Sequence, residues 1–308
     1  MRDVWPRLGR LLGALWLIVS LTFFAVYALP GDPARLILGQ RTNPETLEAF
    51  RQAAGLNDPL AVQYFHFLTK AAELEFGDSL VQRRPVIDLI AERSPQTIVL
   101  VLAAIAVVAI FSLVMPLLIG LADHWSWLTW MDRFWGVAAA APPYVLAVLL
   151  LLVFGGWLEL VPTIFDPNMP SSWGLPALTL AAYPTAIVLK LFHQEIELAH
   201  GALYVTRARA MGFSKAFILL TEILPNAITP AVAALANSLA FFITGTFFVE
   251  VVFGVTGLGS LTYEAIRNND LALLMGLCIV FAAAITIIST SLEIVLILSN
   301  PRLRNRHD

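Results

Sequence analysis

The sequence predicts an all-α membrane protein that crosses the bilayer six times. Two observations support this fold class. Hydrophobic residues make up 58% of the 308-residue chain and the mean hydropathy is +0.78, whereas only 13% of the residues are charged. Soluble domains carry roughly 25% charged residues. The second observation is that the charges are unevenly spread, so that long stretches contain none.

Six uncharged runs are long enough to cross a membrane. They cover residues 11–31, 94–122, 134–158, 167–189, 223–249 and 271–292. Each reaches the roughly 20 residues that a helix needs to span about 30 Å of hydrocarbon. Only helices and closed barrels satisfy their backbone polar groups there, and these runs lack the alternation of barrel strands. Each run is therefore predicted to be a transmembrane helix.

The first run also allows a second interpretation. Arg2, Arg7 and Arg10 precede an apolar stretch, as in a signal peptide, and Val26–Ala28 could form a weak cleavage site. The nineteen residues from Leu11 to Leu29 exceed the usual 7–15 residues of a signal-peptide core. We therefore expect the run to be retained as a helix.

The distribution of Lys and Arg predicts that both termini are cytoplasmic. Eleven of these residues fall on the side that holds the N-terminus, 122–133, 190–222 and the tail after 299. The other side holds eight, of which seven lie in the long loop 30–93. Loops of this length have little influence on orientation, so the positive-inside rule places the termini in the cytoplasm.

The loop 30–93 is predicted to be a folded external region of short helices. The segment "NPETLEAFRQAAGL" has the pattern of a capped helix that ends at Gly55, and "NDPLAVQYFHFLTKAAELEFGDS" has that of a second amphipathic helix. On the opposite side, Trp125, Trp127 and Trp130 fall in the short loop 122–133. We expect them to form an interfacial belt, with docking of a partner as the alternative.

Several kinds of chemistry find no support in the sequence. It contains no HExxH, GxSxG or GxxxxGK[ST] motif, so an enzyme site and an ATP-binding loop are not expected. The net charge of −3 argues against a nucleic-acid partner. Cys278 is the only cysteine and cannot form an intrachain disulfide; we expect it to be a small buried residue.

One cluster of metal-binding residue types is present. His193, Glu197 and His200 share one face of a helix because they are spaced i, i+4, i+7. They also lie just beyond the cytoplasmic end of the fourth span, where polar side chains are simply solvated. The second interpretation is preferred, and no metal site is expected.

Charged residues at the ends of the last two spans suggest a different site. Glu250 ends the fifth span, and Asp270 precedes the sixth. Charges in spans usually face protein or water because lipid exposure is costly. Glu250 is therefore a candidate for a gate or pathway residue, with interfacial anchoring as the alternative. Glu293, near the cytoplasmic end of the sixth span, is expected to pair with arginines of the tail.

The segment "TRARAMGFSKAFILLTEILP" resembles the cytoplasmic EAA loop of ABC-importer permeases. That pattern is Glu-Ala-Ala, three residues, Gly, nine residues and Ile-x-Leu-Pro. Ala208, Gly212, Leu224 and Pro225 fall in register, whereas Thr206 and Arg207 replace Glu-Ala and Glu222 replaces Ile. These departures are typical of the peptide, opine and nickel branch of the family.

Other segments resemble the same branch in the same order along the chain. They are "GDPA", "GLNDPLAVQY", "FGDS", "RPV", "EVVFGVTGLGSLTYEAIRNND" and "NPRLR". Val255-Thr256 stand where Trp-Pro is usual, and Leu271-Ala272 where Tyr-Pro is common. Each fragment is weak alone, but their shared order and spacing make the resemblance strong.

The resemblance implies the permease fold of a type I ABC importer in a bacterial inner membrane. It implies a second, similar permease, two cytoplasmic ATPase subunits that bind ATP and Mg, and an external solute-binding protein, while this chain binds no cofactor. The expected organisation is a tip with the first span (1–30), an external region (31–93), a core with a cytoplasmic coupling loop at 190–228 (94–299), and a tail (300–308).

The resemblance also implies two sets of functional residues. Two short helices around Gly212, the second capped by Ser214, would form a knob that rests on an ATPase subunit. Ala208, Ala210 and Met211 would offer small or adaptable contacts, and Phe213 would insert into the partner. The full coupling set is Thr206, Arg207, Ala208, Arg209, Ala210, Met211, Gly212, Phe213, Ser214 and Pro225; the expected path or gate residues are Glu250, Phe253, Gly257, Gly259 and Asp270.

Peptides are the expected cargo, with nickel chelates and metal–opine complexes as alternatives. An ion-coupled secondary transporter is the alternative from another class. Such a protein would need ionisable residues deep within its spans, and the six runs contain none.

Overall fold

The computed structural model describes residues 4–28, 34–35, 42–53, 57–79, 81–122 and 124–299. Within them the chain is built of helices, and extended backbone pairs only in one isolated bridge between Asp78 and Pro85. The chain divides into two compact units. Unit 1 comprises Met1–Pro95 and Thr256–Asp308, and unit 2 comprises Gln96–Val255. The all-α fold class is thus confirmed.

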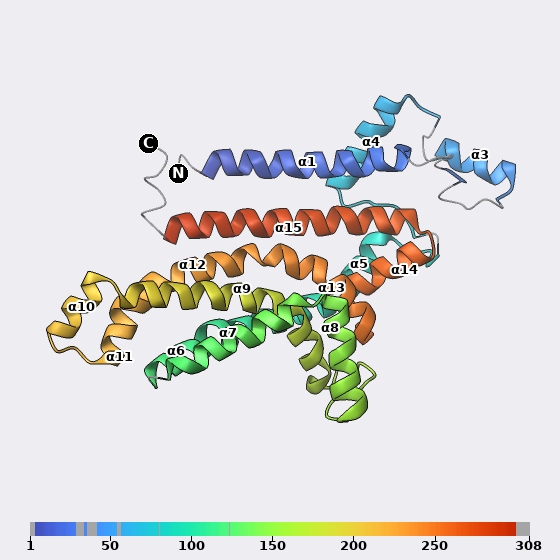
Figure 1. Cartoon of the computed structure of the whole chain (residues 1–308). Coiled ribbons are helices and arrows are strands. Elements are labelled where there is room, and N and C mark those ends of the chain that lie inside the picture. Colours follow the sequence, from blue (N-terminus) through green and yellow to red (C-terminus); the bar gives the residue numbers. More distant parts are fainter. Residues whose placement is uncertain are drawn as a thin grey trace. The chain divides into compact units, whose positions relative to one another are not determined.

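Unit 1 contains two long helices and several short ones. They are α1 (Val4–Ala28), α3 (Pro44–Ala53), α4 (Leu60–Ala72), the start of α5 (Val86–Ala109), α14 (Leu258–Arg267) and α15 (Leu271–Ser299). The helices α1 and α15 pack side by side (Figure 1). The two short helices that were predicted for the external loop are present as α3 and α4; Gly55 lies outside the described residues.

The helix α4 is attached to α1 through an aromatic cluster. Ser20 Oγ and Tyr64 Oη are 2.7 Å apart, and the Phe23 ring lies 5.5 Å from the Tyr64 ring and 5.4 Å from the Phe67 ring. These are favourable separations for aromatic pairs. The described helix α4 of the predicted external region therefore packs on the first span.

The core of unit 1 joins the start of α5 to α14 and α15. Val86, Leu89, Leu261, Leu273 and Leu277 are buried together. A Cβ at Gly276 would lie only 2.5 Å from Val86 Cγ1 and 3.2 Å from Phe76 Cβ. A residue without a side chain is needed for this close approach.

Unit 2 contains the rest of α5 and the helices up to Phe253. They are η1 (Ile110–Val114), α6 (Met115–Leu121), α7 (Trp125–Ala140), α8 (Pro143–Leu150), η2 (Leu151–Trp157), η3 (Pro170–Trp173), α9 (Gly174–His200), α10 (Leu203–Ala210), α11 (Lys215–Ile218), η4 (Leu219–Ile223), α12 (Leu224–Asn237) and α13 (Leu239–Phe253). The segments η1, η2 and η4 are π-helical, and η3 is a 3₁₀-helix.

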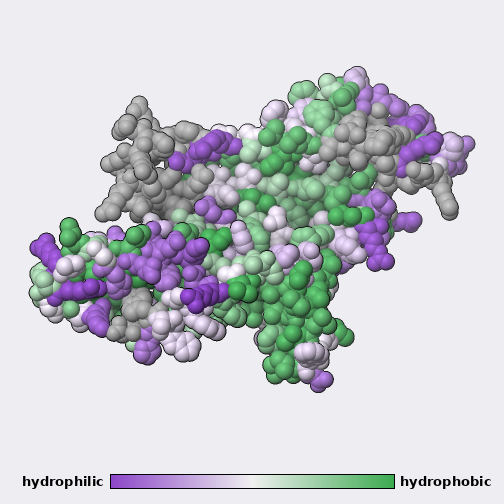
Figure 2. All heavy atoms as spheres, in the orientation of Figure 1, coloured by the Kyte–Doolittle hydropathy of each residue, from purple (hydrophilic) through white to green (hydrophobic). Residues whose placement is uncertain are grey.

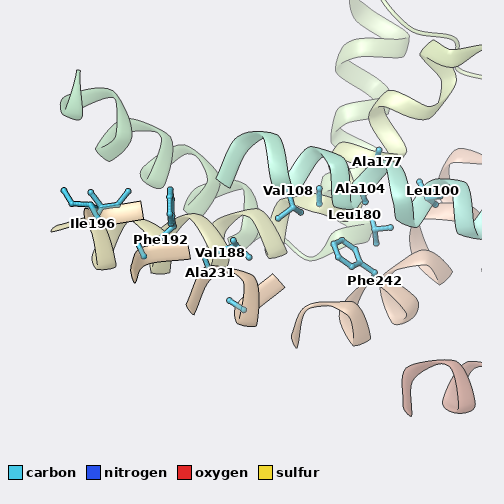
Figure 3. Packing of buried hydrophobic residues seen from close by; sticks show 14 of the residues in the cluster. Leu100, Ala104, Val108, Ala177, Leu180, Val188, Phe192, Ile196, Ala231 and Phe242 are labelled. Carbon is cyan, nitrogen blue, oxygen red and sulfur yellow. The ribbon is translucent and has the colours of Figure 1, made fainter. Parts of the chain in front are cut away.

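The helix α9 forms the centre of unit 2. It packs against α7, α8, α12 and α13, and α12 and α7 flank it in Figure 1. Figure 3 shows the side chains that α5 and α9 contribute to the core, among them Leu100, Leu180 and Phe192. A Cβ at Gly245 would lie 2.7 Å from Leu180 Cδ1, so this glycine allows α13 to approach α9 closely.

Five helical stretches of the described chain are long and apolar enough to cross a membrane on their own, and two bent helix pairs raise the possible number to seven. The third predicted span corresponds to one bent pair, Ser126–Ala140 with Pro143–Trp157, at 106°. Ala141 and Pro142 each precede a proline and take extended conformations, which end the helix. With this pair as the third span, six spans fit the structure. The fifth predicted run divides at Ser238 between α12 and α13.

Two local expectations were wrong. The segment 122–133 is not a loop, because α7 begins at Trp125; Trp127 and Trp130 are exposed on it. Cys278 was expected to be buried, but its side chain is exposed on α15. The helix α15 is apolar on all of its faces, so the sequence pattern did not indicate which face packs against the other helices of unit 1 and which face is exposed.

Candidate functional site

The segment 203–218, which we call the knob, consists of α10, a four-residue turn and α11. Gly212 has φ +81°. The N–H of Gly212 bonds to the carbonyl of Arg209, and that of Phe213 to the carbonyl of Ala208. This is the Schellman arrangement, in which a left-handed residue, usually glycine, closes a helix. The turn that was predicted at Gly212 is confirmed.

The second helix of the knob begins as the sequence predicted. The Ser214 hydroxyl accepts a hydrogen bond from the Phe217 N–H at 3.2 Å. Such an N-cap satisfies a donor that has no partner within the helix. Both ends of the turn are therefore fixed by local hydrogen bonds.

The inner side of the knob belongs to the core of unit 2. Val205, Ala208, Ile218 and Leu219 are all buried in the main hydrophobic cluster. The expectation that Ala208 offers a contact to a partner is therefore wrong. Its methyl group packs in the core of unit 2 and holds α10 against that core.

The outer side of the knob combines apolar and basic groups. Met211 is 61% exposed, and Phe213 stacks on Phe217 with ring centroids 4.6 Å apart. Figure 2 shows hydrophilic side chains gathered around α10 and α11, whereas the region of α8 is hydrophobic. Thr206, Arg207, Arg209 and Ala210 are exposed as well.

The knob continues into the next helix through a π-helical segment. In η4 the N–H of Leu224 bonds to the carbonyl of Leu219, five residues earlier. Pro225 follows in the first turn of α12 and is exposed.

A cavity of about 680 Å³ lies at the base of the knob, between α7, α9, α10 and α11. His193, Glu197 and His200 line it together with Arg209 and Lys215. The Arg209 guanidinium lies 2.9 Å from His200 Nδ1, and His193 Nε2 lies 3.5 Å from Glu197 Oε1. Within the described residues, no three potential ligands are grouped around a common metal position.

Glu250 lies in the last turn of α13 and is fully buried in unit 2. Its Oε1 accepts a hydrogen bond from Thr97 Oγ1 at 2.6 Å. Interfacial anchoring is therefore the wrong alternative for this carboxylate. Phe253 is also buried, and Gly254 ends the helix with φ +73°.

Asp270 lies in unit 1, between α14 and α15. Its exposed fraction is 2%, and it accepts hydrogen bonds from Ser79 Oγ at 2.5 Å and from the Leu273 N–H at 3.2 Å. Gly257 precedes α14 and Gly259 lies in its first turn; both are buried. Residues 258–267 of the segment before Asp270 form the helix α14.

The sequence did not reveal the hydrogen-bond partners of Glu250 and Asp270, nor a contact between two aromatic rings. Thr97 and Ser79 are 153 and 191 residues away from the carboxylates that they bind. Tyr183 of α9 and Phe241 of α13 lie with their ring centroids 4.7 Å apart. No local pattern marks such pairs, because only the packing of distant helices brings them together.

Comparison with known proteins agrees with these features. Residues 124–305 match the family of binding-protein-dependent transport system inner membrane components, and residues 7–101 match the N-terminal region of such membrane components. The chain is 31% identical to the glutathione transport system permease protein GsiC of Escherichia coli over 302 residues, 97% of each chain. It is 30% identical to the protein of the same name from Shigella flexneri over the same share. The chain therefore belongs to the family of binding-protein-dependent transport system inner membrane components.

Proposed function

We propose that the chain is one of two similar permease subunits of an ATP-driven importer, which bind two cytoplasmic ATPase subunits. Membership of the family makes the chain a transport subunit, not an enzyme, in a system with an ATPase, a partner permease and a solute-binding protein. The stoichiometry and the cytoplasmic position of both termini are part of the proposal. The excess of Lys and Arg in the short loops of one side supports this orientation.

The knob is the surface that we assign to the ATPase. The observation that supports this role most is its two-sided construction. Val205 and Ala208 fix it in the core, while Met211 and the Phe213–Phe217 pair face outward from a turn closed by hydrogen bonds. An exposed aromatic anchor on a rigid support is typical of a docking surface. Movement of a bound ATPase would then be transmitted to α9 and α12 without deforming the knob.

The cargo that we propose is a short peptide. GsiC is named as a glutathione transport permease, and glutathione is itself a small peptide. Nickel chelates and metal–opine complexes are the alternative. Uptake of labelled glutathione, a labelled dipeptide and radioactive nickel by cells with the complete transporter would decide between them. Nickel uptake without peptide uptake would contradict the proposed cargo.

Substitution of Phe213 by Asp tests the proposed coupling role. A charge on the tip should weaken ATPase association by about ten-fold or more, because hot-spot residues contribute about 2 kcal/mol or more. Co-purification of the ATPase and peptide uptake would be measured together. Ile164→Asp is the matched control, since Ile164 is an apolar residue outside the knob that is 82% exposed.

A cysteine at position 213 provides an independent measurement. In a Cys278→Ser background it should form a crosslink to an ATPase subunit in native membranes. Normal ATPase binding by Phe213→Asp, together with no crosslink, would contradict the coupling role. It would leave the family assignment intact.

A further inference from the structure

Two adjoining hollows lie along α7 and α9 in unit 2, away from the knob and from Glu250. One has a volume of about 210 Å³ and the other of about 350 Å³. Ala139, Ala140 and Tyr183 line both of them. We call the combined depression the α7–α9 groove. Its size falls within the range of small-molecule sites, which measure about 300–1,000 Å³.

The groove exists because of the break in the third span. Residues 138–141 are four alanines, and the two prolines that follow prevent α7 from continuing. The bend of 106° directs α8 away from the line of α7. The methyl side chains and the break between α7 and α8 leave room that larger residues would fill.

An aromatic pair lines the groove. Tyr183 from α9 and Phe241 from α13 lie 4.7 Å apart with their planes inclined by 32°. Gly245 lies beside this pair, and a Cβ there would lie 2.7 Å from Leu180 Cδ1, so the glycine allows α13 to approach α9 at this point. Tyr183 remains exposed to the groove, so its ring is available for a ligand.

The larger of the two hollows is lined by positive charges. Arg133 and Lys190 line it and are exposed, and within the described part of the chain neither forms an ion pair. Asp132 is the acid of this hollow, and its Oδ2 lies 4.0 Å from His193 Nδ1. Two cations and one carboxylate favour a ligand that carries a carboxylate group.

We propose that the α7–α9 groove is this chain's face of the solute path and that it selects short peptides with a free carboxylate. Arg133 and Lys190 attract the carboxylate, while Tyr183 and Phe241 contact the apolar and amide parts of the peptide. This inference rests on the proposed function. It assigns substrate contact to residues other than the five predicted from the sequence.

Transport of a matched pair of peptides tests the role of the charges. The probes are a labelled dipeptide and the same dipeptide amidated at its C-terminus, supplied with the same binding protein. The double variant Arg133→Gln, Lys190→Gln should reduce uptake of the free acid about ten-fold and leave uptake of the amide unchanged, as expected for loss of a carboxylate contact. Arg267→Gln removes an exposed cation of α14 outside the groove and should leave the ratio unchanged.

The aromatic pair is tested by Tyr183→Ala and Phe241→Ala. Peptide uptake should fall, whereas ATP hydrolysis stimulated by the binding protein should persist. That combination separates a path defect from a coupling defect. Phe134→Ala is the control, because Phe134 is an exposed aromatic residue of α7 that does not line the groove. Tyr183→Phe keeps the ring and should transport, which guards against a folding defect.

Thiol labelling gives a readout that does not depend on uptake. A cysteine at position 183, in a Cys278→Ser background, should react with a membrane-impermeant reagent and be protected by the dipeptide. If it reacts only with a membrane-soluble reagent and peptide gives no protection, the groove faces lipid and the inference is overturned. If peptide is imported normally by all groove variants, the inference fails while the proposed function stands. If the wild type imports no peptide, the proposed function fails, and with it the assigned ligand.

Discussion

Glu250 and Asp270 are two buried carboxylates that share one interaction and differ in their helical position. Each accepts a short hydrogen bond from a hydroxyl group, Thr97 for Glu250 and Ser79 for Asp270. Asp270 stands just before α15 and also accepts the Leu273 N–H. Glu250 stands in the last turn of α13. A negative charge is favourable at a helix N-terminus and unfavourable at a C-terminus.

The difference shows which of the two carboxylates is explained by the fold. Asp270 caps its own helix and fixes the segment that holds Ser79, so its presence follows from local stability. Glu250 sits at the unfavourable end of its helix within an apolar core, and burial of a carboxylate is costly. Helix capping does not account for the position of Glu250. We therefore keep it, and not Asp270, as a candidate for a role in the transport cycle.

The largest effect is expected for Glu250→Ala. It removes the acceptor of the buried Thr97 hydroxyl and leaves a cavity, which should reduce the free energy of unfolding by about 3 kcal/mol. Thermal unfolding of the protein in detergent would measure the loss. Glu250→Gln is the matched variant, since its amide oxygen can still accept from Thr97. It should fold normally yet transport poorly, and normal uptake by this variant would make Glu250 a structural residue like Asp270.

The next effect is expected for Asp270→Ala, at about 2 kcal/mol. This change removes an N-cap, which contributes about 1 kcal/mol, and the acceptor of Ser79 Oγ. Asp270→Asn keeps one acceptor oxygen for the Leu273 N–H, and its amide group can donate to Ser79 Oγ instead, so it should lose less than Asp270→Ala. Uptake per inserted molecule should be unchanged in both variants. A large uptake defect in a stable Asp270→Asn protein would contradict the distinction drawn between the two carboxylates.

Removal of the donors should have smaller effects. Thr97→Val and Ser79→Ala each delete one hydroxyl while the carboxylate stays, for an expected loss of about 1 kcal/mol. The double-mutant cycle of Thr97→Val with Glu250→Gln would measure the coupling of that pair. Additive losses would show that the two side chains do not act together.

The smallest effect is expected for Glu264→Gln, which provides a baseline. Glu264 Oε1 lies 4.0 Å from Arg93 Nη2 in unit 1, and its side chain is 42% exposed. Exposed ion pairs contribute about 0–1 kcal/mol because water and salt screen them. The unfolding midpoint should therefore barely change. A shift as large as that of Asp270→Ala would mean that burial is not what distinguishes these carboxylates.

Much of the fold could be predicted from the sequence because membrane helices and caps leave local signals. Uncharged runs predicted the spans, and Gly212 and Ser214 predicted the turn and cap of the knob. The break of the third span was signalled by Pro142 and Pro143 but not interpreted as a bend. The burial of Ala208 depends on which face of α10 packs inward, and the exposure of Cys278 depends on which face of α15 does. The sequence pattern does not indicate either face.

The candidate site was predicted less completely than the fold. The knob residues are contiguous, so one segment revealed all of them. Tyr183 and Phe241 come from different helices, and the hollow beside them depends on a bend and on four alanines. Glu250 was noticed for its charge, but its hydrogen bond to Thr97 could not be foreseen. The residues of a local turn or helix cap can be identified from one segment of the sequence, whereas a groove forms only when several helices pack together.

The π-helical segment η4 sets the rotational phase between the knob and α12. It accommodates one residue more than an α-helical path between the same ends would, and it lies directly after α11. Shortening residues 219–223 by a single position would leave a continuous helix. Because the π turn holds the extra residue, this deletion would keep the knob and α12 in roughly the same phase. The same deletion inside α12 would turn everything before it by about 100° around the axis and displace it by about 1.5 Å. The turn at η4 is therefore the place where this helix can lose one residue without redirecting Phe213.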